Sequence, residues 1–297
     1  MLTPLLGESP PCSLRLHADC ILESVDKMSV RTYNPSVRVG NWNEDLCLEE
    51  DLLKDFLDKK DKGELLIQKA TGLLETILKE VRLSRPSDGY LHIGDVVCLL
   101  HKPTSSLLSV NMSAARAYDA RQLLSGCGVS SSRNLQPCTR NVFVIGSYDD
   151  PAAKTGDVVC YEQPIILTTL PNEGGQLSLE TDRATFMQHS KYTREQELTV
   201  RDELSYKSAW RLLCFSPEER LETGGTPVSV NTLLFVNHCK TNQHLCLHTD
   251  WLHRTPFGRE YEVTASSKFN THKAEDLHNH FMIVTGDPRE HIAHDDK

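Results

Sequence analysis

Residues 94–110 read GDVVCLLHKPTSSLLSV: an apolar run, a short polar loop and a second apolar run. Residues 231–247 read NTLLFVNHCKTNQHLCL and follow the same order, with a His, a Thr and a Leu at the same spacing in both stretches. A second copy opens with the identical GDVVC at Gly156, but it has lost the His and the Thr and carries a longer excursion, IILTTLPNEGGQLSL. Short apolar runs bounded by turn residues predict β-strands, and their repetition predicts three similar units that share one core.

Each long copy carries its His and Thr at the turn between the two apolar runs. These turn residues are His101 and Thr104 in the first copy and His238 and Thr241 in the last. Each unit ends in an apolar strand led by an aromatic residue, and these residues are Phe143, Trp210 and Phe281. One buried aromatic per unit about a pseudo-threefold axis predicts a mainly β protein with a β-trefoil fold, whose closed barrel leaves few free strand edges. A β-sandwich competes with this fold but does not explain the threefold recurrence.

The segment Asn237–Asp250 is rich in histidine and cysteine, which raises the possibility of a zinc site. Zinc takes about four nitrogen or sulfur ligands in a tetrahedron, and the candidates are Cys239, His244, Cys246 and His248. In an extended chain the last three lie in a row on one face and the leucines between them on the other, so they cannot surround a cation. We therefore expect no metal ion and no cofactor, and interpret the segment as a hairpin with a half-buried strand.

A helical arm is predicted before the β units. Leucines recur from Leu48 at helical spacing, Phe56 lies on the same stripe, and acidic residues crowd the first turns while lysines crowd the last. This pattern is typical of an amphipathic helix whose charges suit the helix dipole. A second helical pattern runs to Val81, and Pro86 with the Asp88-Gly89 turn stops it.

The composition changes along the chain give the expected domain boundaries. They are a disordered tail at 1–36, the helical arm at 37–85, a β-trefoil at 89–286 with units at about 89–146, 152–215 and 228–286, and a mobile tail at 287–297. The tails are expected because they contain no sustained hydrophobic period.

Charge and hydropathy narrow the class of protein. The chain has 297 residues and a formal net charge of −9, which disfavours a nucleic-acid partner because phosphate backbones are bound by clustered Lys and Arg. It contains no long apolar run and no pattern of a secretion signal at its start, so we expect a soluble intracellular protein with no membrane partner. The ten cysteines are irregularly spaced, and we interpret them as reduced thiols, several of them in strands.

No pattern of catalytic residues is found. The sequence has no nucleophile elbow, P-loop, HExxH motif or GxGxxG motif. Asp95 and Asp157 recur in the repeated GDVV, but a Gly-Asp pair before a strand is a turn signal. We therefore predict no catalytic residues and no enzyme activity.

The last unit resembles a MIR-type trefoil repeat. That pattern runs from a strand through His and Thr to Leu-His, a Pro/Gly turn, a Glu-Val strand and an aromatic closing strand. The corresponding positions are His238, Thr241, Leu247-His248, Pro256 and Gly258, Glu262-Val263, and Phe281 in place of the usual Trp.

A wider resemblance is carried by three stretches: VRVGNWNEDLCLEEDLLKDFLDKKDKGELLIQ at 37–68, DGYLHIGDVV at 88–97 and VTGDPR at 284–289. Together they are similar to the cilia- and flagella-associated protein 161 family. The resemblance implies a structural microtubule inner protein in the lumen of axonemal doublet microtubules, located in the cytoplasmic cytoskeleton of cilia and flagella. It further implies contacts with α/β-tubulin and other inner proteins, and no catalytic activity.

Candidate partner-binding residues lie in and after the most specific run of this resemblance: Asn41, Trp42, Asn43 and Phe56. Trp42 either anchors a partner, as Trp residues often do at interfaces, or folds back onto the trefoil core. The Phe56 stripe packs either within the chain or on a partner. The alternative function is a soluble ligand-binding trefoil adaptor of the sugar-binding type, which would need an exposed aromatic residue and a polar cluster.

Overall fold

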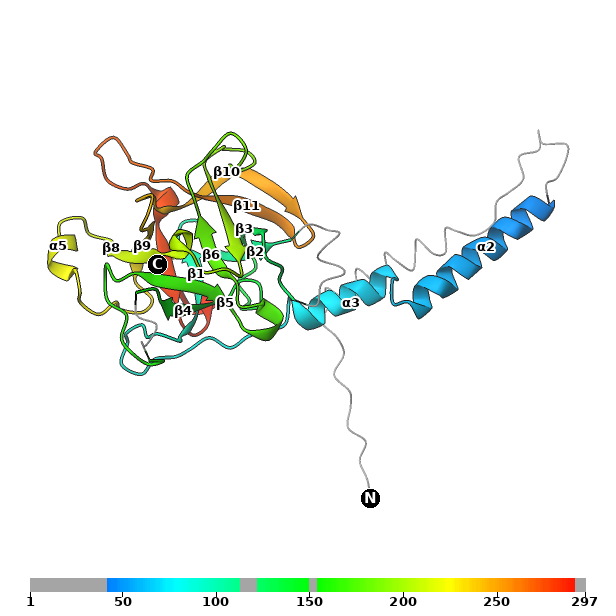
Figure 1. The fold of residues 1–297 in the computed structure, drawn as a ribbon, viewed down its shortest axis with the longest axis horizontal. Coiled ribbons are helices and arrows are strands. Elements are labelled where there is room, and N and C mark those ends of the chain that lie inside the picture. Colours follow the sequence, from blue (N-terminus) through cyan, green and yellow to red (C-terminus); the bar gives the residue numbers. More distant parts are fainter. Residues whose placement is uncertain (1–41, 113–121, 150–153, 292–297) are drawn as a thin grey trace, which may run out of the picture. The chain divides into compact units, whose positions relative to one another are not determined.

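The computed structural model describes residues 42–112, 122–149 and 154–291, and the chain divides into two units after Asp61 (Figure 1). The first unit contains helix α2, Trp42–Asp61. Ion pairs one turn apart, such as Lys59 with Asp55 at 2.6 Å, add to its stability. After the helix, Gly63 adopts a φ of 73°, a conformation that favours glycine.

Helix α3, Leu66–Thr76, opens the second unit and ends well before residue 85. The prediction that the helical pattern continues to Val81 is wrong, because α3 ends at Thr76, residues 77–78 form a turn and residues 79–85 contain no helix. Ile77 is fully buried in the main core, and Val81 donates its backbone N–H to the Pro137 carbonyl at 3.1 Å. Packing and hydrogen bonds with distant segments thus outweigh the local helical preference.

The second unit, Lys62–Lys297, is called the β unit below. It is mainly β, with twelve strands in its described residues. They are β1 Val96–His101, β2 Ser106–Asn111, β3 Cys127–Ser132, β4 Phe143–Ser147, β5 Ile165–Thr169, β6 Ser178–Thr181, β7 Gln196–Arg201, β8 Trp210–Cys214, β9 Leu233–His238, β10 Leu245–Thr255, β11 Gly258–Ala265 and β12 Phe281–Val284. Short helices lie between them: η1 Asn172–Gly174, η2 Tyr206–Ser208, α5 Arg220–Thr223, η3 Leu277–Asn279 and η4 Pro288–His291.

The strand pairings form two closed sets. The strands β1, β4, β5, β8, β9 and β12 pair in that order, and β12 pairs back with β1, with Leu99 opposite Ile283. The strands β3, β7 and β11 each pair with the other two. The remaining strands β2, β6 and β10 each pair with the member of the second set that follows them in sequence. The β unit thus contains three repeats with the same order of strands: β1–β4 is the first repeat, β5–β8 the second and β9–β12 the third.

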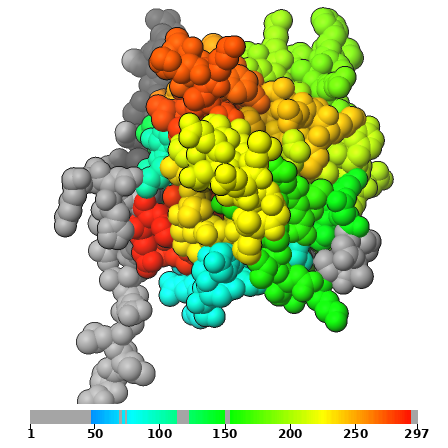
Figure 2. All heavy atoms as spheres, turned by 90° about the vertical axis from the view of Figure 1, so that its left-hand side faces the viewer, coloured from blue at the N-terminus to red at the C-terminus, as the bar shows by residue number. Residues whose placement is uncertain are grey.

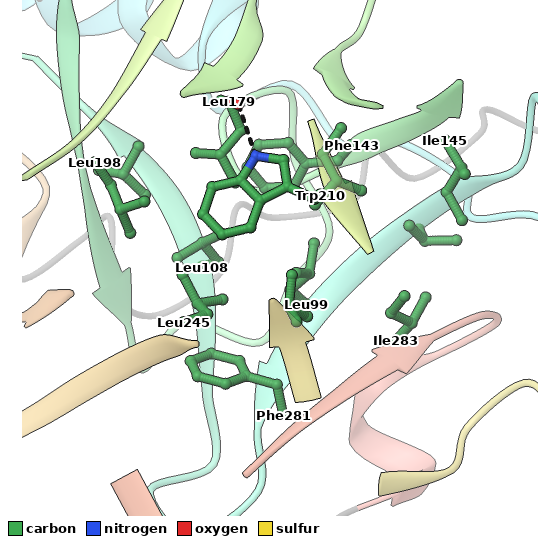
Figure 3. Packing of buried hydrophobic residues seen from close by; sticks show 14 of the residues in the cluster. Leu99, Leu108, Phe143, Ile145, Leu179, Leu198, Trp210, Leu245, Phe281 and Ile283 are labelled. Atoms are coloured by element: carbon green, nitrogen blue, oxygen red, sulfur yellow. Dashed lines mark hydrogen bonds between the residues drawn. The ribbon is translucent and has the colours of Figure 1, made fainter. Parts of the chain in front are cut away.

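The main hydrophobic core lies inside these strands. Phe143, Trp210 and Phe281 have no exposed surface, and they belong to one cluster with the leucines and isoleucines drawn in Figure 3. The indole Nε1 of Trp210 donates a hydrogen bond to the Leu179 carbonyl at 2.8 Å, so its polar atom is satisfied in the core. The three aromatic side chains lie at the start of β4, β8 and β12 and occupy equivalent places in the three repeats.

The chain ends differ in part from the expected tails. Residues 1–36 and 292–297 lie outside the described residues. Within the segment 287–297 expected as a tail, Pro288–His291 form the 3-10 helix η4 and Pro288 is buried. Among the described helices, none has both the length and the apolar character needed to cross a membrane.

Candidate functional site

The predicted turn residues make matching contacts in the first and third repeats. His101 Nδ1 lies 2.8 Å from Thr104 Oγ1, and His238 Nδ1 lies 2.9 Å from Thr241 Oγ1. The Nε2 atom of each histidine lies 3.0 Å from a backbone carbonyl, that of Leu277 for His101 and that of Lys207 for His238. The His101 ring contacts Phe281 and the His238 ring contacts Trp210, at centroid distances of 5.0 and 5.1 Å. Each pair therefore fixes a hairpin to a core aromatic side chain.

Thr169 occupies the equivalent place in the second repeat, β5–β8, where the sequence lacks the histidine. It lies opposite Phe143, as His238 lies opposite Trp210 and His101 opposite Phe281. Its Oγ1 donates to the Gly174 carbonyl at 2.5 Å and accepts from the Leu177 N–H at 2.8 Å. A shorter side chain thus closes the turn by hydrogen bonds to its own loop.

The two turn histidines make the stability of the fold depend on pH. Burial lowers the pKa of His101 and of His238 from 6.5 to about 4, although carbonyl hydrogen bonds partly oppose it. The unfolded chain then binds protons first, so stability is complete above pH 6.5 and is lost as the pH falls toward 4. We expect up to about 3 kcal/mol of loss for each histidine. Thermal unfolding between pH 7 and 4 checks this. Replacing both by glutamine should reduce the pH dependence and leave the share of His244, whose pKa burial also lowers to about 4.

A buried ion pair joins β11 to the loop before β4. Arg140 Nη2 lies 2.7 and 2.9 Å from the two carboxylate oxygens of Glu260, and both side chains are almost fully buried. Ser130 Oγ donates to Glu260 at 2.6 Å, and the Arg140 guanidinium stacks 3.9 Å from the Phe257 ring centroid. Every charged group of this cluster has a partner, as buried charges require.

The histidine-rich segment forms the predicted hairpin, because His238 N–H donates to the Gln243 carbonyl at 2.8 Å between β9 and β10. The prediction of a half-buried strand is wrong: residues 245–248 of β10 are buried on both faces. His248 Nε2 lies 3.0 Å from the Glu195 carboxylate, which also binds Lys268 and Thr264. Burial opposes ionisation of Glu195, but these hydrogen bonds outweigh it and lower its pKa to about 2.

The predicted thiols Cys98 and Cys246 are fully buried in β1 and β10. Burial raises the pKa of Cys246 to about 12 and that of Cys98 well above its usual value. Among residues 42–112, 122–149 and 154–291, no three His, Cys, Asp or Glu side chains gather as metal ligands would.

A hollow of about 980 Å³ opens beside the mutually paired strands β3, β7 and β11. Its lining includes Lys191, His253 and Glu197, and burial raises the pKa of the Glu197 carboxyl. Near His253, the rings of Tyr192 and Trp251 stack in parallel at 5.4 Å, and both are partly exposed. This arrangement combines exposed aromatic faces with a polar cluster, which is the chemistry that a small polar ligand needs.

The sequence did not predict the Tyr192–Trp251 pair. Its two rings come from segments that are distant in the chain, and the register of β10 shifts between His248 and Leu252 beside Trp251. A bulge of this kind interrupts the alternation of side chains between the two faces of a strand. The sequence pattern therefore does not predict to which face the Trp251 side chain points. The one local hint is the charged Asp250 next to Trp251, in the part of β10 that is exposed.

The predicted partner-binding residues fall in the first unit. Asn41 lies outside the described residues, and Trp42 and Asn43 begin α2. Phe56 is 49% exposed, and its stripe is similarly open, with exposed fractions of 42–59% for Leu48, Leu52, Leu53 and Leu57. The structure therefore brings the helical stripe together on α2 as an apolar surface that is open to contact.

Comparison with known proteins gives consistent matches. Residues 69–286 match the model of the cilia- and flagella-associated protein 161-like domain. The protein of that name from Danio rerio is 39% identical over 272 residues, 87% of this chain and 90% of the relative. That from Mus musculus is 37% identical over 276 residues, 88% of this chain and 91% of the relative. Among solved structures, the SDF2-like protein from Arabidopsis thaliana overlays with a TM-score of 0.49 at 15% identity, covering 66% of this chain and 94% of that chain.

Proposed function

Because the chain belongs to the cilia- and flagella-associated protein 161 family, we propose that it is a structural microtubule inner protein of the axoneme. In this proposal it lies in the lumen of doublet microtubules, contacts α/β-tubulin and other inner proteins, and stabilises the tubulin lattice of motile cilia and sperm flagella. It acts without cofactor or catalysis, and neither nucleic acid nor membrane is its partner.

The observation that carries the proposal is the open apolar stripe on α2. Five large apolar side chains that are 42–59% exposed on one helix form an unusual surface for a soluble monomer, and such surfaces mark contacts with other proteins. Their helical spacing suits a groove on a partner, which an amphipathic helix fills with its apolar face.

The β unit supplies the second contact in this proposal, and we propose that it is a MIR-like β-trefoil. Support comes from the closed ring of six strands, from the three mutually paired strands and from the equivalent places of Phe143, Trp210 and Phe281. A rigid body of this kind and a separate helical arm can contact different subunits at once. Weak contacts made together raise the avidity without any single strong site.

Charge alone does not supply the attraction, because the chain carries a net charge of −9 and tubulin is acidic overall. The binding energy in this proposal comes from apolar anchors, shape and hydrogen bonds, with charge complementarity only at local patches.

The test is stepwise extraction of isolated motile axonemes by detergent, high salt and sarkosyl, with quantitative mass spectrometry beside tubulin. We expect the wild-type chain to survive detergent and salt. Replacing Leu52 and Phe56 by aspartate should reduce the salt-resistant fraction about tenfold, because charges on the stripe prevent its burial. The matched control is Leu221→Asp in α5, a site 94% exposed, which should stay like wild type. Release of the wild-type chain by detergent alone would refute the luminal proposal.

A ligand-binding adaptor of the sugar-binding type is the second candidate function. The stacked Tyr192–Trp251 pair beside the hollow favours it, because sugar rings pack on exposed aromatic faces. A glycan array with residues 62–297 tests this candidate, and that fragment keeps Ile77 in its core. Binding lost in Trp251→Ala would support the adaptor, whereas an array without binding would exclude glycans.

A further inference from the structure

The loop between β6 and β7 presents two apolar side chains to solvent. Phe186 is 92% exposed and Met187 is 89% exposed, although both residue types are normally buried. They lie at the tip of a turn closed by two hydrogen bonds, from the Thr185 N–H to the Gln188 carbonyl at 2.9 Å and from the Gln188 N–H to Thr185 Oγ1 at 3.1 Å. This loop rises beside the β10–β11 hairpin in Figure 1 and forms part of the rim of the molecule in Figure 2.

The base of the loop is fixed to the β unit by a buried carboxylate. Glu262, 2% exposed in β11, accepts hydrogen bonds from the backbone N–H groups of Tyr192 and Thr193 at 2.9 and 3.1 Å. A second turn is closed by the Ser190 N–H to the Glu195 carbonyl at 2.9 Å. The two apolar side chains are thus held outward by an ordered support, and such preorganisation reduces the entropy lost on binding.

The charges of the loop are locally positive on an acidic protein. Arg183, Lys191 and Arg194 are exposed, and none of them has an ion-pair partner within the described part of the chain. The two acidic residues of the loop are already neutralised, Asp182 by Lys207 and Lys240 and Glu195 by Lys268. Arg194 lines the same small hollow as Phe186, and Arg183 and Lys191 lie three and five residues from Phe186 in the sequence. The loop that carries the apolar tip therefore has three cations without an ion-pair partner among the described residues.

We propose that the loop Arg183–Arg194 is a docking element for an acidic protein surface, with Phe186 and Met187 inserted into an apolar depression that carboxylates surround. Phe, Met and Arg are enriched at protein interfaces, and complementary charge gives such contacts their specificity. Two side chains are too small an apolar anchor to hold a protein stably on a bilayer. The inference rests on the proposed function, in which tubulin is the acidic partner, and it gives an acidic chain a cationic contact with an acidic lattice.

The test uses full-length chains expressed in ciliated cells in place of the native chain. Axonemes are extracted with rising sodium chloride, and the retained protein is quantified against tubulin. We expect Phe186→Ser with Met187→Ser to reduce the retained fraction about tenfold. Lys191→Glu should shift release to lower salt, because it reverses one charge of the patch. Leu221→Ser and Lys273→Glu are the matched controls, at an apolar and a cationic site that are exposed elsewhere on the β unit.

The outcomes separate the two proposals. Wild-type retention that the double variant and Lys191→Glu leave unchanged would overturn the docking loop while the luminal function stands. Loss of the wild-type chain in detergent would overturn both. Flotation with phosphatidylcholine–phosphatidylserine vesicles gives a third arm, in which binding that requires Phe186 and Met187 would assign the loop to a bilayer instead. Sedimentation of the purified chain is the fourth, and a dimer dissolved by the double variant would assign it to a second copy.

Discussion

Trp210→Ala is expected to lower the free energy of unfolding by about 4 kcal/mol or more. Trp210 is the largest fully buried side chain among the described residues, so alanine leaves a cavity in the shared core of three repeats. The substitution also removes the hydrogen bond to the Leu179 carbonyl, which is left buried without its donor. His238 in addition loses the ring against which it packs.

Urea unfolding of the purified chain, followed by circular dichroism, measures this effect. Trp210→Phe should recover most of the stability because it restores the apolar volume, although not the hydrogen bond. The matched control is Trp251→Ala, since this Trp is 45% exposed and should cost less than about 1 kcal/mol. A small effect at Trp210, similar to that at Trp251, would contradict the assignment of Trp210 to the core.

The second large effect is expected at the buried ion pair. Arg140→Leu should lower the free energy of unfolding by about 3–5 kcal/mol, because among the described side chains it leaves the buried Glu260 charge with Ser130 as its hydrogen-bond partner. The Arg140 Nε also donates to the Val110 carbonyl at 3.0 Å, so the substitution orphans a backbone acceptor as well.

A double-mutant cycle separates the pair from its surroundings. Replacing Arg140 and Glu260 together by leucine should cost less than the sum of the single substitutions, with a coupling of roughly 2 kcal/mol, since no charge then stays buried alone. Arg133→Leu serves as the control for loss of a cation, because Arg133 is exposed and its guanidinium contacts a neutral partner, Tyr261 of the same strand. Additive effects of the two core substitutions would show that the pair contributes no specific energy.

The repeat in the sequence predicted much of the fold. The hairpin turns at His101 and His238 and the aromatic residues at the start of the closing strands follow from local spacing, because each repeat encodes its own strands and turn. The second repeat shows that the same place tolerates a different solution, since Thr169 replaces the histidine. Strand order and hairpins are therefore the part of the structure that a single sequence predicts well.

The failures share one physical cause. The helical pattern runs to Val81, but the packing of Ile77 in the core and hydrogen bonds to the segment around Pro137 end the helix at Thr76. The sequence pattern of β10 predicts that its polar face is exposed to solvent, but Glu195 covers His248 on that face. The Tyr192–Trp251 pair and the support of the docking loop by Glu262 likewise depend on segments far apart in sequence. Because these contacts join distant segments, none of them produces a local hydrophobic periodicity from which it could be predicted.

The pairing of β1 with β12 has a consequence for folding during synthesis of the chain. These strands lie near opposite ends of the β unit, and one reaches the cytosol roughly 10–40 s before the other at a synthesis rate of about 5–20 residues per second. Throughout that interval β1 can pair with β2 and β4, but its partner strand β12 is missing, and a nascent chain in this state is a natural client of chaperones. A message cut short anywhere before Phe281 would yield a product that cannot close the ring of six paired strands, so late nonsense mutations should be as damaging as early ones.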